Sequence, residues 1–442
     1  MLRQRALVVG RPRGPRFRTS GPETAAHGRR RRSEPVPSRF VAHNGSVRDR
    51  LRPIRPMRLP VDRPAPAPAS APAVPVPALV VPGTPENDRL RLALGALTAV
   101  SIIVTLLHLL AVYPIAVDIR IPLDAAARWI HGGQPYLASS FDVTSGAGQP
   151  FLYPPFVLPV LAPFASLPLE PVAAGWAAAC LVVATWTLRR LGLPAWSWPL
   201  ALAWAPFLQT LLGLNVQVLL FGAFVALFVD RPGGRAPSSP PVIPTARPMR
   251  ERDVGTGSRP PMVDGILGVF VALLKTSQVH PWVYLLRRRP REALLGVAAA
   301  IALVLVTLPF TGIGAWFDWF AQARRAAQPG LAVGGISLLH FLPFPLAVAA
   351  GVATVLLVFA VPRRHAAAWI GLLTLVGSPD LHYFGLLFAL PAMLTVRREI
   401  ALVAAFAIST YTTHGAWAGI LLVTVALAAS YRRPALLEPA AA

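Results

Sequence analysis

Apolar runs recur along most of this chain, and the first, Leu92–Ala116, is long enough to cross the roughly 30 Å hydrocarbon core of a bilayer. Inside lipid the backbone must satisfy its own hydrogen bonds, which favours helices. A hydrophobic fraction of 54% with only 14% charged residues over 442 positions is also unlike a soluble protein. We therefore predict an all-α polytopic membrane protein with about 9–12 transmembrane or re-entrant helices.

The later apolar segments vary in length, and several are shorter than the about 20 residues that a full span needs. They lie at Pro154–Leu167, Pro171–Leu188, Trp196–Leu212, Val216–Val229, Val263–Leu274, Val279–Leu286, Ala293–Pro309, Leu338–Val361, Ala366–Gly377, Phe384–Val396, Ile400–Tyr411 and Ala416–Ser430. Short paired segments fit broken or re-entrant helices, which are stable where protein or water covers the backbone. We expect Pro154–Leu167 to lie along the interface or to re-enter the membrane.

The N-terminal region, residues 1–88, is rich in Pro, Arg, Ala and Ser and lacks the apolar periodicity of a core. We predict a disordered cytoplasmic tail, partly polyproline II, that precedes an integral-membrane domain at 89–433. Two further polar pieces are predicted, a Pro/Arg-rich cytoplasmic linker at 230–262 and a short C-terminal tail at 434–442. A net charge of +23 admits contact between the tail and anionic lipid or nucleic acid. We favour a solvated tail and expect no nucleic acid, because no aromatic residues interleave with the arginines.

Basic residues between the apolar segments predict the orientation. The positive-inside rule assigns these groups to the cytoplasm. They are Arg189/Arg190, Arg231–Arg259, Arg287–Arg291, Arg363/Arg364, Arg397/Arg398 and Arg432/Arg433. The polar breaks between the groups then face the other side, under a first outer loop at 118–150. We thus predict a multi-pass plasma-membrane protein whose site faces away from the cytoplasm.

Lys275 is the only lysine of the chain, and it interrupts the apolar stretch Ile266–Leu286. An ionised lysine at mid-membrane costs about 2.5–3.5 kcal/mol on insertion scales, so it usually faces a wet cavity and meets an anion. A phosphate, held by a compact ammonium, is one such anion. Snorkelling to a nearby interface is the alternative. His280 follows in the same polar interruption, where Pro281 disfavours helix.

The first outer loop opens with Asp118, and a carboxylate at a membrane surface can act as a general base on a hydroxyl. Asp124, Arg128 and His131 share one face if Leu123–Ile130 is a short helix. In that case Asp124 binds substrate or forms an ordinary ion pair with Arg128.

Further polar residues stand at breaks between apolar segments. Tyr153 opens one segment before two prolines, and Asn215 and Gln217 lie between two others. These amides would bind sugar hydroxyls or satisfy a helix end, and the sequence leaves both open. His382 lies in a second broken segment, where a site role and a buried structural role are both open. The chain has no phosphate-cradling glycine loop, no Rossmann fingerprint and no Cys/His cluster with metal-ligand spacing, so we expect no cofactor and no metal.

In order and spacing these features resemble the polyprenol-phosphate-mannose-dependent mannosyltransferases of glycosyltransferase family 87, membrane enzymes of the C-type glycosyltransferase fold that are common in actinobacteria. The resemblance covers roughly Leu92–Arg398. It rests on Asp118 followed by Ala-Ala and Gly-Gly-Gln-Pro-Tyr136, on Phe151-Leu-Tyr153-Pro-Pro155, on Leu-Asn215-Val-Gln217, on Ala-Leu-Leu-Lys275, and on Ser378-Pro379 with His382. The order Asn215 then Gln217 departs from the family's more usual Gly-Gln-x-Asn.

The resemblance implies that a mannosyl or related unit passes from a polyprenyl phosphate to a glycolipid or glycan acceptor outside the cytoplasm, in cell-envelope lipoglycan synthesis. Asp118 would be the general base, and His382 would lie in the site. Lys275, with Arg120, would hold the donor phosphate. Two alternatives stay open. One is a lipid-linked sugar flippase or secondary transporter without bond chemistry, and the other is an inactive family member with a scaffold role.

Overall fold

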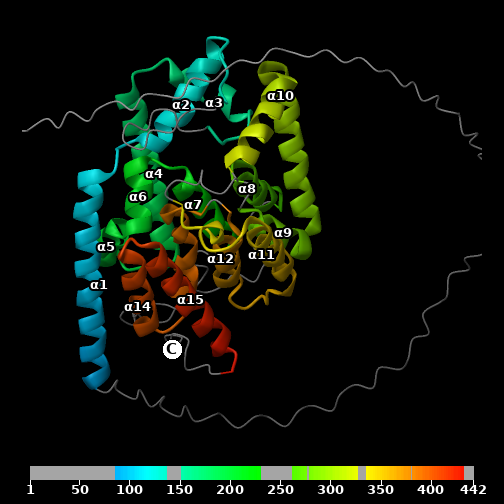
Figure 1. Ribbon diagram of the computed structural model, residues 1–442. Coiled ribbons are helices and arrows are strands. Elements are labelled where there is room, and N and C mark those ends of the chain that lie inside the picture. Colours follow the sequence, from blue (N-terminus) through cyan, green and yellow to red (C-terminus); the bar gives the residue numbers. More distant parts are fainter. Residues whose placement is uncertain are drawn as a thin grey trace, which may run out of the picture. The chain divides into compact units, whose positions relative to one another are not determined.

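The computed structural model describes residues 85–136, 151–229, 261–275, 278–326, 335–379 and 381–432, all within one compact unit, Val80–Ala442. In these ranges the chain is built from helices (Figure 1). They are α1 (Pro85–Val112), α2 (Val117–Ile130), α3 (Val157–Ala165), α4 (Leu169–Arg190), η1 (Ala195–Ser197), α5 (Trp198–Ala203), α6 (Ala205–Gly213), α7 (Gln217–Phe228), α8 (Pro261–Leu274), α9 (His280–Arg288), α10 (Pro290–Ala326), η3 (Leu338–His340), α11 (Phe344–Leu357), η4 (Val358–Ala360), α12 (Ala366–Gly377), η5 (Tyr383–Ala389), α13 (Leu390–Met393), α14 (Arg398–Ser409) and α15 (Thr413–Ser430).

Four stretches of the described residues are long and apolar enough to cross a membrane. They are Asp88–Ile130, Leu169–Arg190, Pro290–Arg324 and Thr413–Ser430. Shorter apolar helices accompany them at Gln217–Phe228, Met262–Leu274, Phe344–Ala360, Ala366–Gly377 and Tyr383–Met393. The predicted fold class, an all-α polytopic membrane protein, is therefore confirmed.

Most of the predicted polar segments fall outside the described residues. This holds for the tail up to residue 84, for 137–150 of the first loop, for 230–260 of the linker and for 433–442. α1 already begins at Pro85, inside the predicted tail, and α8 begins at Pro261, inside the predicted linker.

The core of the bundle surrounds α7, a short helix that is buried on almost every side. Its phenylalanines pack edge-to-face on η5, where the ring of Phe388 lies 5.6 Å from Phe221 and 4.9 Å from Phe224. Edge-to-face geometry is favoured because the rim of one ring is positive and the face of the other is negative. A helix that is apolar all round is one that other helices cover, so the uniform hydrophobicity of α7 places it at the centre.

The peripheral helix α1 exposes most of its apolar side chains, as a lipid-facing helix does, and only one stripe is buried. On that stripe Arg91 pairs with Glu399 at 2.6 Å, Thr98 donates to the carbonyl of Leu402, and Thr105 donates to that of Ser409. Hydrocarbon is as apolar as leucine, so packing and interhelical hydrogen bonds, rather than burial from water, hold such a helix in place. These contacts fasten α1 to α14 along its length.

Two segments fold differently from the sequence prediction. Trp196–Leu212, predicted as one apolar segment, is divided into η1, α5 and α6, because Trp204 is extended and Pro206 fits only the first turn of a new helix. The predicted segment Ala293–Pro309 is part of a longer helix, α10. α10 breaks at Gly312, whose φ of 72° is left-handed, and then continues to Ala326.

Beyond the kink, α10 joins α2, the segment 151–156 and α3 in a small module at one end of the unit (Figure 1). We call these elements, with residues 313–326 of α10, the cap. Its centre contains Phe151, Leu158 and Trp319, which pack against Ala125 and Ala126 of α2. Trp319 also donates its indole N–H to the carbonyl of Leu152 at 2.9 Å. The indole of Trp319 thus anchors the last part of α10 to the segment 151–156.

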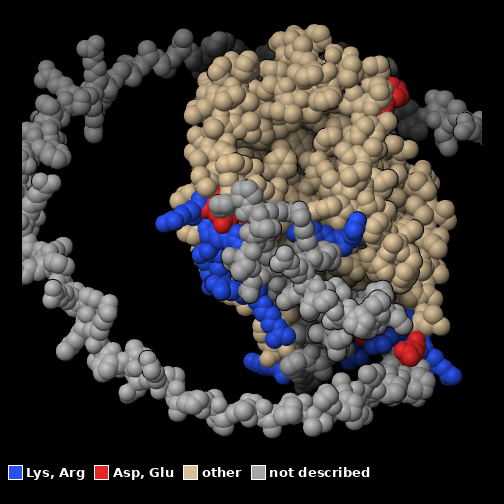
Figure 2. Space-filling model, turned by 180° about the vertical axis from the view of Figure 1, so that it is seen from behind, with Lys and Arg blue, Asp and Glu red and all other residues tan. Residues whose placement is uncertain are grey.

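Basic side chains gather at the opposite end. On the face drawn in Figure 2, Lys and Arg occupy the lower half and are nearly missing from the upper half. A partly buried clamp joins α8 to α10, since Arg289 contacts Asp264 at 3.1 Å and Glu292 at 3.0 Å. The backbones meet closely beside the clamp, because a Cβ on Gly265 would strike the carbonyl of Glu292. Small residues commonly allow such approach between membrane helices.

Candidate active site

Asp118 is positioned by a tight connection between α1 and α2. Ala116 adopts the left-handed conformation, with φ at 61°, and its N–H donates to the carbonyl of Leu212 at 2.8 Å. A non-glycine residue there carries strain that the surrounding structure must hold. The helix begins at Val117, so Asp118 lies in its first turn and not in a loop, and the predicted start near Leu123 is wrong by more than a turn. Asp118 is thereby fixed against the end of α6.

The Asp118 carboxylate lies over Gly213. A Cβ added to Gly213 would collide with Asp118 Oδ2 and would lie 3.2 Å from the hydroxyl of Tyr113. The amide of Asn215 and the ammonium of Lys275 both act on this carboxylate. Its Oδ2 is nevertheless buried without a hydrogen-bond partner among the described residues. A buried oxygen with an open lone pair is ready to accept a proton.

The break between α6 and α7 presents the two amides. Leu214 is left-handed, with φ at 57°, and its carbonyl accepts from the indole of Trp176 at 2.9 Å. Asn215 Oδ1 accepts from the backbone N–H of Gln217 at 2.8 Å, which satisfies the start of α7. Asn215 thus serves the helix end with its oxygen, and its amide is also close enough to act on Asp118. Of the two uses that the sequence left open, the structure shows the second, because Asn215 satisfies a helix end.

Lys275 is the first residue beyond α8, and its ammonium points inward. Nζ lies 3.5 Å from Gln217 Oε1 and 4.8 Å from the centre of the Phe384 ring. Gln278 donates to the same Gln217 oxygen at 2.9 Å. A cation over an aromatic face is stabilised by the ring's negative surface. The lysine therefore does not snorkel outward in this structure, but lies beside Asp118.

His382 reaches the same place from the break after α12. It is extended, with φ at −112° and ψ at 168°, and its ring stacks on Phe384 at 5.1 Å with a 20° angle between the planes. The preceding carbonyl, of Leu381, accepts from Ile336 N–H, and the indole of Trp417 donates to Ile336 O. Phe384 thus has Lys275 over its ring and His382 stacked upon it. Asp118, Asn215, Gln217, Lys275 and His382 form one cluster, which we call the polar centre.

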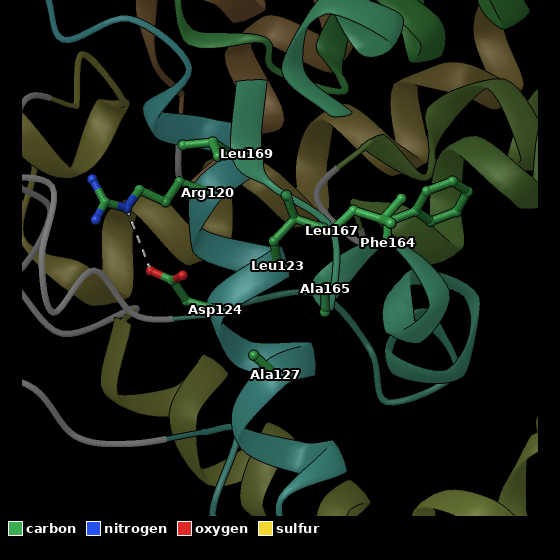
Figure 3. A pocket seen from close by; sticks show the side chains of 8 residues that line it. All are labelled: Arg120, Leu123, Asp124, Ala127, Phe164, Ala165, Leu167 and Leu169. Atoms are coloured by element: carbon green, nitrogen blue, oxygen red, sulfur yellow. Dashed lines mark ion pairs between the residues drawn. The ribbon is translucent and has the colours of Figure 1, made fainter. Parts of the chain in front are cut away.

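Other predicted site residues lie elsewhere. Arg120 and Asp124 form an exposed ion pair at 3.8 Å (Figure 3). The alternative pairing of Asp124 with Arg128 does not occur, because Arg128 donates to the carbonyls of Gln134 and Pro135. The pair borders a cavity of about 180 Å³ between α2 and the turn from α3 to α4. That cavity is lined by Arg120, Leu123, Asp124, Ala127, Phe164, Ala165, Leu167 and Leu169.

Tyr153 and His280 make structural contacts. The carbonyl of Tyr153 accepts from the Tyr136 hydroxyl at 2.9 Å, inside the cap. Burial, with the nearby Asp318 carboxylate, raises the pKa of Tyr136, so this phenol stays protonated and can donate. His280 is buried at the start of α9, where Nε2 is 3.0 Å from the hydroxyl of Thr354. The hydroxyl of Thr354 in turn donates to Gly351 O.

A second group of polar residues, which the sequence did not lead us to expect, lies next to Asp118. Gln209 donates to the hydroxyl of Tyr411 at 3.0 Å, and its amide also interacts with the hydroxyl of Tyr113. The Tyr383 ring lies 4.4 Å from that of Tyr411. Gln209 within an apolar run was the available signal, since a polar residue at membrane depth usually has a purpose. No group of three or more metal-ligating side chains occurs among the residues that the structure describes.

Comparison with known proteins assigns this chain to a family. The model of glycosyltransferase family 87 matches residues 151–379, more than half of the chain. The match contains Asn215, Gln217 and Lys275, and it ends shortly before His382 and begins after Asp118. No curated protein and no solved structure matches the chain. With its apolar helices and this match, the chain belongs to glycosyltransferase family 87, and it is a membrane glycosyltransferase.

Proposed function

We propose that this glycosyltransferase moves a mannosyl or related unit from a polyprenyl phosphate to a hydroxyl of a glycolipid or glycan, on the extracytoplasmic side of the plasma membrane. One observation carries the proposal. The unpartnered Oδ2 of Asp118 lies in a cluster with the ammonium of Lys275, so a base and a cation act at one place. An acceptor proton and a donor phosphate need those two groups.

The reaction follows from their roles. Asp118 accepts the proton of the acceptor hydroxyl as its oxygen attacks the anomeric carbon. The bond from that carbon to the phosphate oxygen breaks, and polyprenyl phosphate leaves with the electron pair. Lys275 stabilises the negative charge that develops on the leaving phosphate. His382, stacked on Phe384 beside Lys275, supplies a further hydrogen-bonding group to the same side.

The extracytoplasmic side is proposed from the distribution of charge. Arginines cluster at the end remote from the cap (Figure 2), and basic loops stay in the cytoplasm. Arg120, which the sequence analysis joined to Lys275 in phosphate binding, is held by Asp124 on the outer surface of α2. We therefore assign the phosphate to Lys275 alone.

The test measures transfer of radiolabelled mannose from polyprenyl phosphate mannose to octyl α-mannoside by the purified full chain in nanodiscs. We expect Asp118→Asn to lower the rate by about 10²–10⁴-fold, the range of general base catalysis. Asp124→Asn, on the same helix but in the exposed ion pair, is the matched control and should retain activity. Undiminished transfer by Asp118→Asn would remove the mechanism.

Two further arms address the donor and the alternatives. Polyprenyl phosphate arabinose, offered in place of the mannose donor, identifies the sugar by the ratio of the two rates. Breaks after α8 and α12 would suit a transporter equally well. Movement of the labelled donor across proteoliposomes without covalent product would decide for a flippase, and neither movement nor transfer would favour an inactive scaffold.

A further inference from the structure

Asp118 has a second neighbourhood, opposite in character to the Lys275 side. It is formed by Tyr113 at the end of α1, Gln209 of α6, Tyr383 at the start of η5 and Tyr411 after α14. We call these four side chains the tyrosine wall. The Tyr113 hydroxyl and the Asp118 carboxylate both lie over Gly213, so the wall starts at the base itself.

Hydrogen bonds and ring contacts connect the wall. Gln209 donates to the hydroxyl of Tyr411 at 3.0 Å, and its amide also interacts with the hydroxyl of Tyr113. The rings of Tyr411 and Tyr383 lie 4.4 Å apart at an angle of 37°. All four side chains are uncharged at neutral pH, since phenols ionise near pH 10. The two sides of Asp118 therefore differ, one cationic and the other neutral, aromatic and rich in hydrogen-bonding groups.

The backbone at the start of η5 separates the two sides. His382 is extended, and η5 begins at the next residue, Tyr383. His382 and Phe384 stack on one another on the Lys275 side. Tyr383, between them, turns to Tyr411 instead. One short stretch of chain thus contributes to both neighbourhoods.

The wall retains unused hydrogen-bonding capacity. The side-chain oxygen of Gln209 and the hydroxyl of Tyr383 are buried without a partner among the described residues, in side chains that are only 8% and 5% exposed. Buried polar atoms of native proteins nearly always have a partner, so an unpartnered pair points to a ligand. Tyr411 is held in the left-handed conformation, with φ at 55°, which is strained for a tyrosine. Tyr113 and Tyr411 are partly exposed, so the wall is accessible along these two rings.

We propose that the tyrosine wall is the acceptor subsite, and that it recognises a sugar ring carrying the hydroxyl that Asp118 deprotonates. Aromatic faces cover the apolar face of a sugar ring, and a carboxamide with phenols donates to and accepts from its hydroxyls. A phosphate-bearing donor belongs to the Lys275 side, where the cation lies. This inference rests on the proposed function and adds the residues that bind the acceptor sugar and select it.

The experiment separates donor from acceptor kinetics, with labelled polyprenyl phosphate mannose and octyl α-mannoside as probes. We expect Gln209→Met and Tyr411→Phe each to raise KM for octyl α-mannoside about tenfold or more, because a site built for hydroxyls loses affinity when its partners are removed. KM for the donor should stay within about twofold. Lys275→Met should show the reverse pattern.

Matched controls are an exposed glutamine and a remote tyrosine. Gln134→Met changes an exposed side chain of the loop after α2. Tyr431→Phe removes a hydroxyl that follows α15 and accepts from the indole of Trp369. Both should leave the two KM values unchanged. Thermal unfolding of each variant identifies folding failure. If Gln209→Met does not fold, Tyr411→Phe, which deletes one oxygen atom, still tests whether the tyrosine wall binds the acceptor.

A binding measurement distinguishes this inference from the proposed function. Tritiated octyl α-mannoside should bind to Asp118→Asn protein, and adding Gln209→Met should weaken that binding about tenfold. If wild-type protein transfers no mannose but shows this binding pattern, the function fails and the sugar site stands. Unchanged acceptor KM and binding in both wall variants, or a rise in donor KM instead, would overturn the inference.

Discussion

Asp118 and Asp264 are both inward-facing aspartates in the first turn of a helix, yet their carboxylates have different charged partners. Asp264 contacts the guanidinium of Arg289, which Glu292 also contacts, in a clamp between α8 and α10. Asp118 interacts with an amide and a lysine, but among the described residues no cation forms an ion pair with its carboxylate as Arg289 does with Asp264. The comparison teaches that a matched buried charge supports the fold, whereas an unmatched one is available for chemistry.

The largest expected effects are a loss of transfer activity in an Asp118 variant and a loss of stability in a variant of the Asp264 clamp. Asp118→Asn should abolish nearly all transfer and leave thermal stability unchanged, since no hydrogen bond to Oδ2 is lost. Arg289→Met should lower stability by about 3–5 kcal/mol, because the buried Asp264 and the partly buried Glu292 lose their shared guanidinium. Activity per folded molecule should persist in Arg289→Met.

Thermal unfolding and transfer rates, measured on the same preparations, check this pattern. Arg291→Met, two residues away and exposed, is the control for removing one arginine. If Asp118→Asn loses as much stability as Arg289→Met, then both aspartates stabilise the fold, and the contrast drawn between them is wrong.

A smaller effect is expected at Gly213, which makes room for the unmatched carboxylate. Gly213→Ala would drive a methyl group into Asp118 Oδ2, and a displacement of a catalytic group by about 1 Å costs on the order of 10²-fold in rate. Gly175→Ala is the matched control, because a Cβ there meets nothing within 4 Å. Equal transfer rates in the two variants would contradict the placement of the base over Gly213.

The smallest effect is a change in stability at the contact between α1 and α14, since α1 is the helix that leads to Asp118. Thr105→Val removes the hydrogen bond to the carbonyl of Ser409, and such bonds between membrane helices average about 0.6 kcal/mol. Thr185→Val, whose hydroxyl bonds only within α4, is the control. A loss well above that value in unfolding measurements would mean that α1 is a main support of the site.

Much of this architecture was predictable because the membrane restricts what apolar segments can do. The breaks at 214–216, at Lys275 and at 378–382 were visible as polar residues and prolines inside apolar runs, and the structure keeps each as a break. The helix considered from Leu123 begins too late, because α2 starts at Val117 and includes Pro122, a residue more usual in a first turn. The division of Trp196–Leu212 was missed because uniform hydrophobicity does not show where a helix bends.

The site was partly predictable for the same reason. Asp118, Lys275 and His382 were chosen as ionisable residues at breaks, and the structure brings them into one region. Arg120, Asp124, Tyr153 and His280 were chosen on the same grounds and lie outside it, because helix phase and local pairing decide which way each side chain points. Gln209, Tyr113, Tyr383 and Tyr411 carry no pattern that links them, since they come from four separate elements.

By itself the sequence determined that the chain is helical and lies in a membrane, because hydrocarbon does not tolerate unpaired backbone groups. It also marked the polar interruptions where chemistry is possible, because a charged side chain in the membrane is costly and usually has a function. Only the tertiary structure decided which interruptions meet. It brings Asp118 against Gly213, keeps Lys275 within 3.5 Å of Gln217, and ties Arg120 to Asp124 outside the centre. Hydropathy is a property of segments, whereas a site depends on the directions of individual side chains, and packing alone sets those directions.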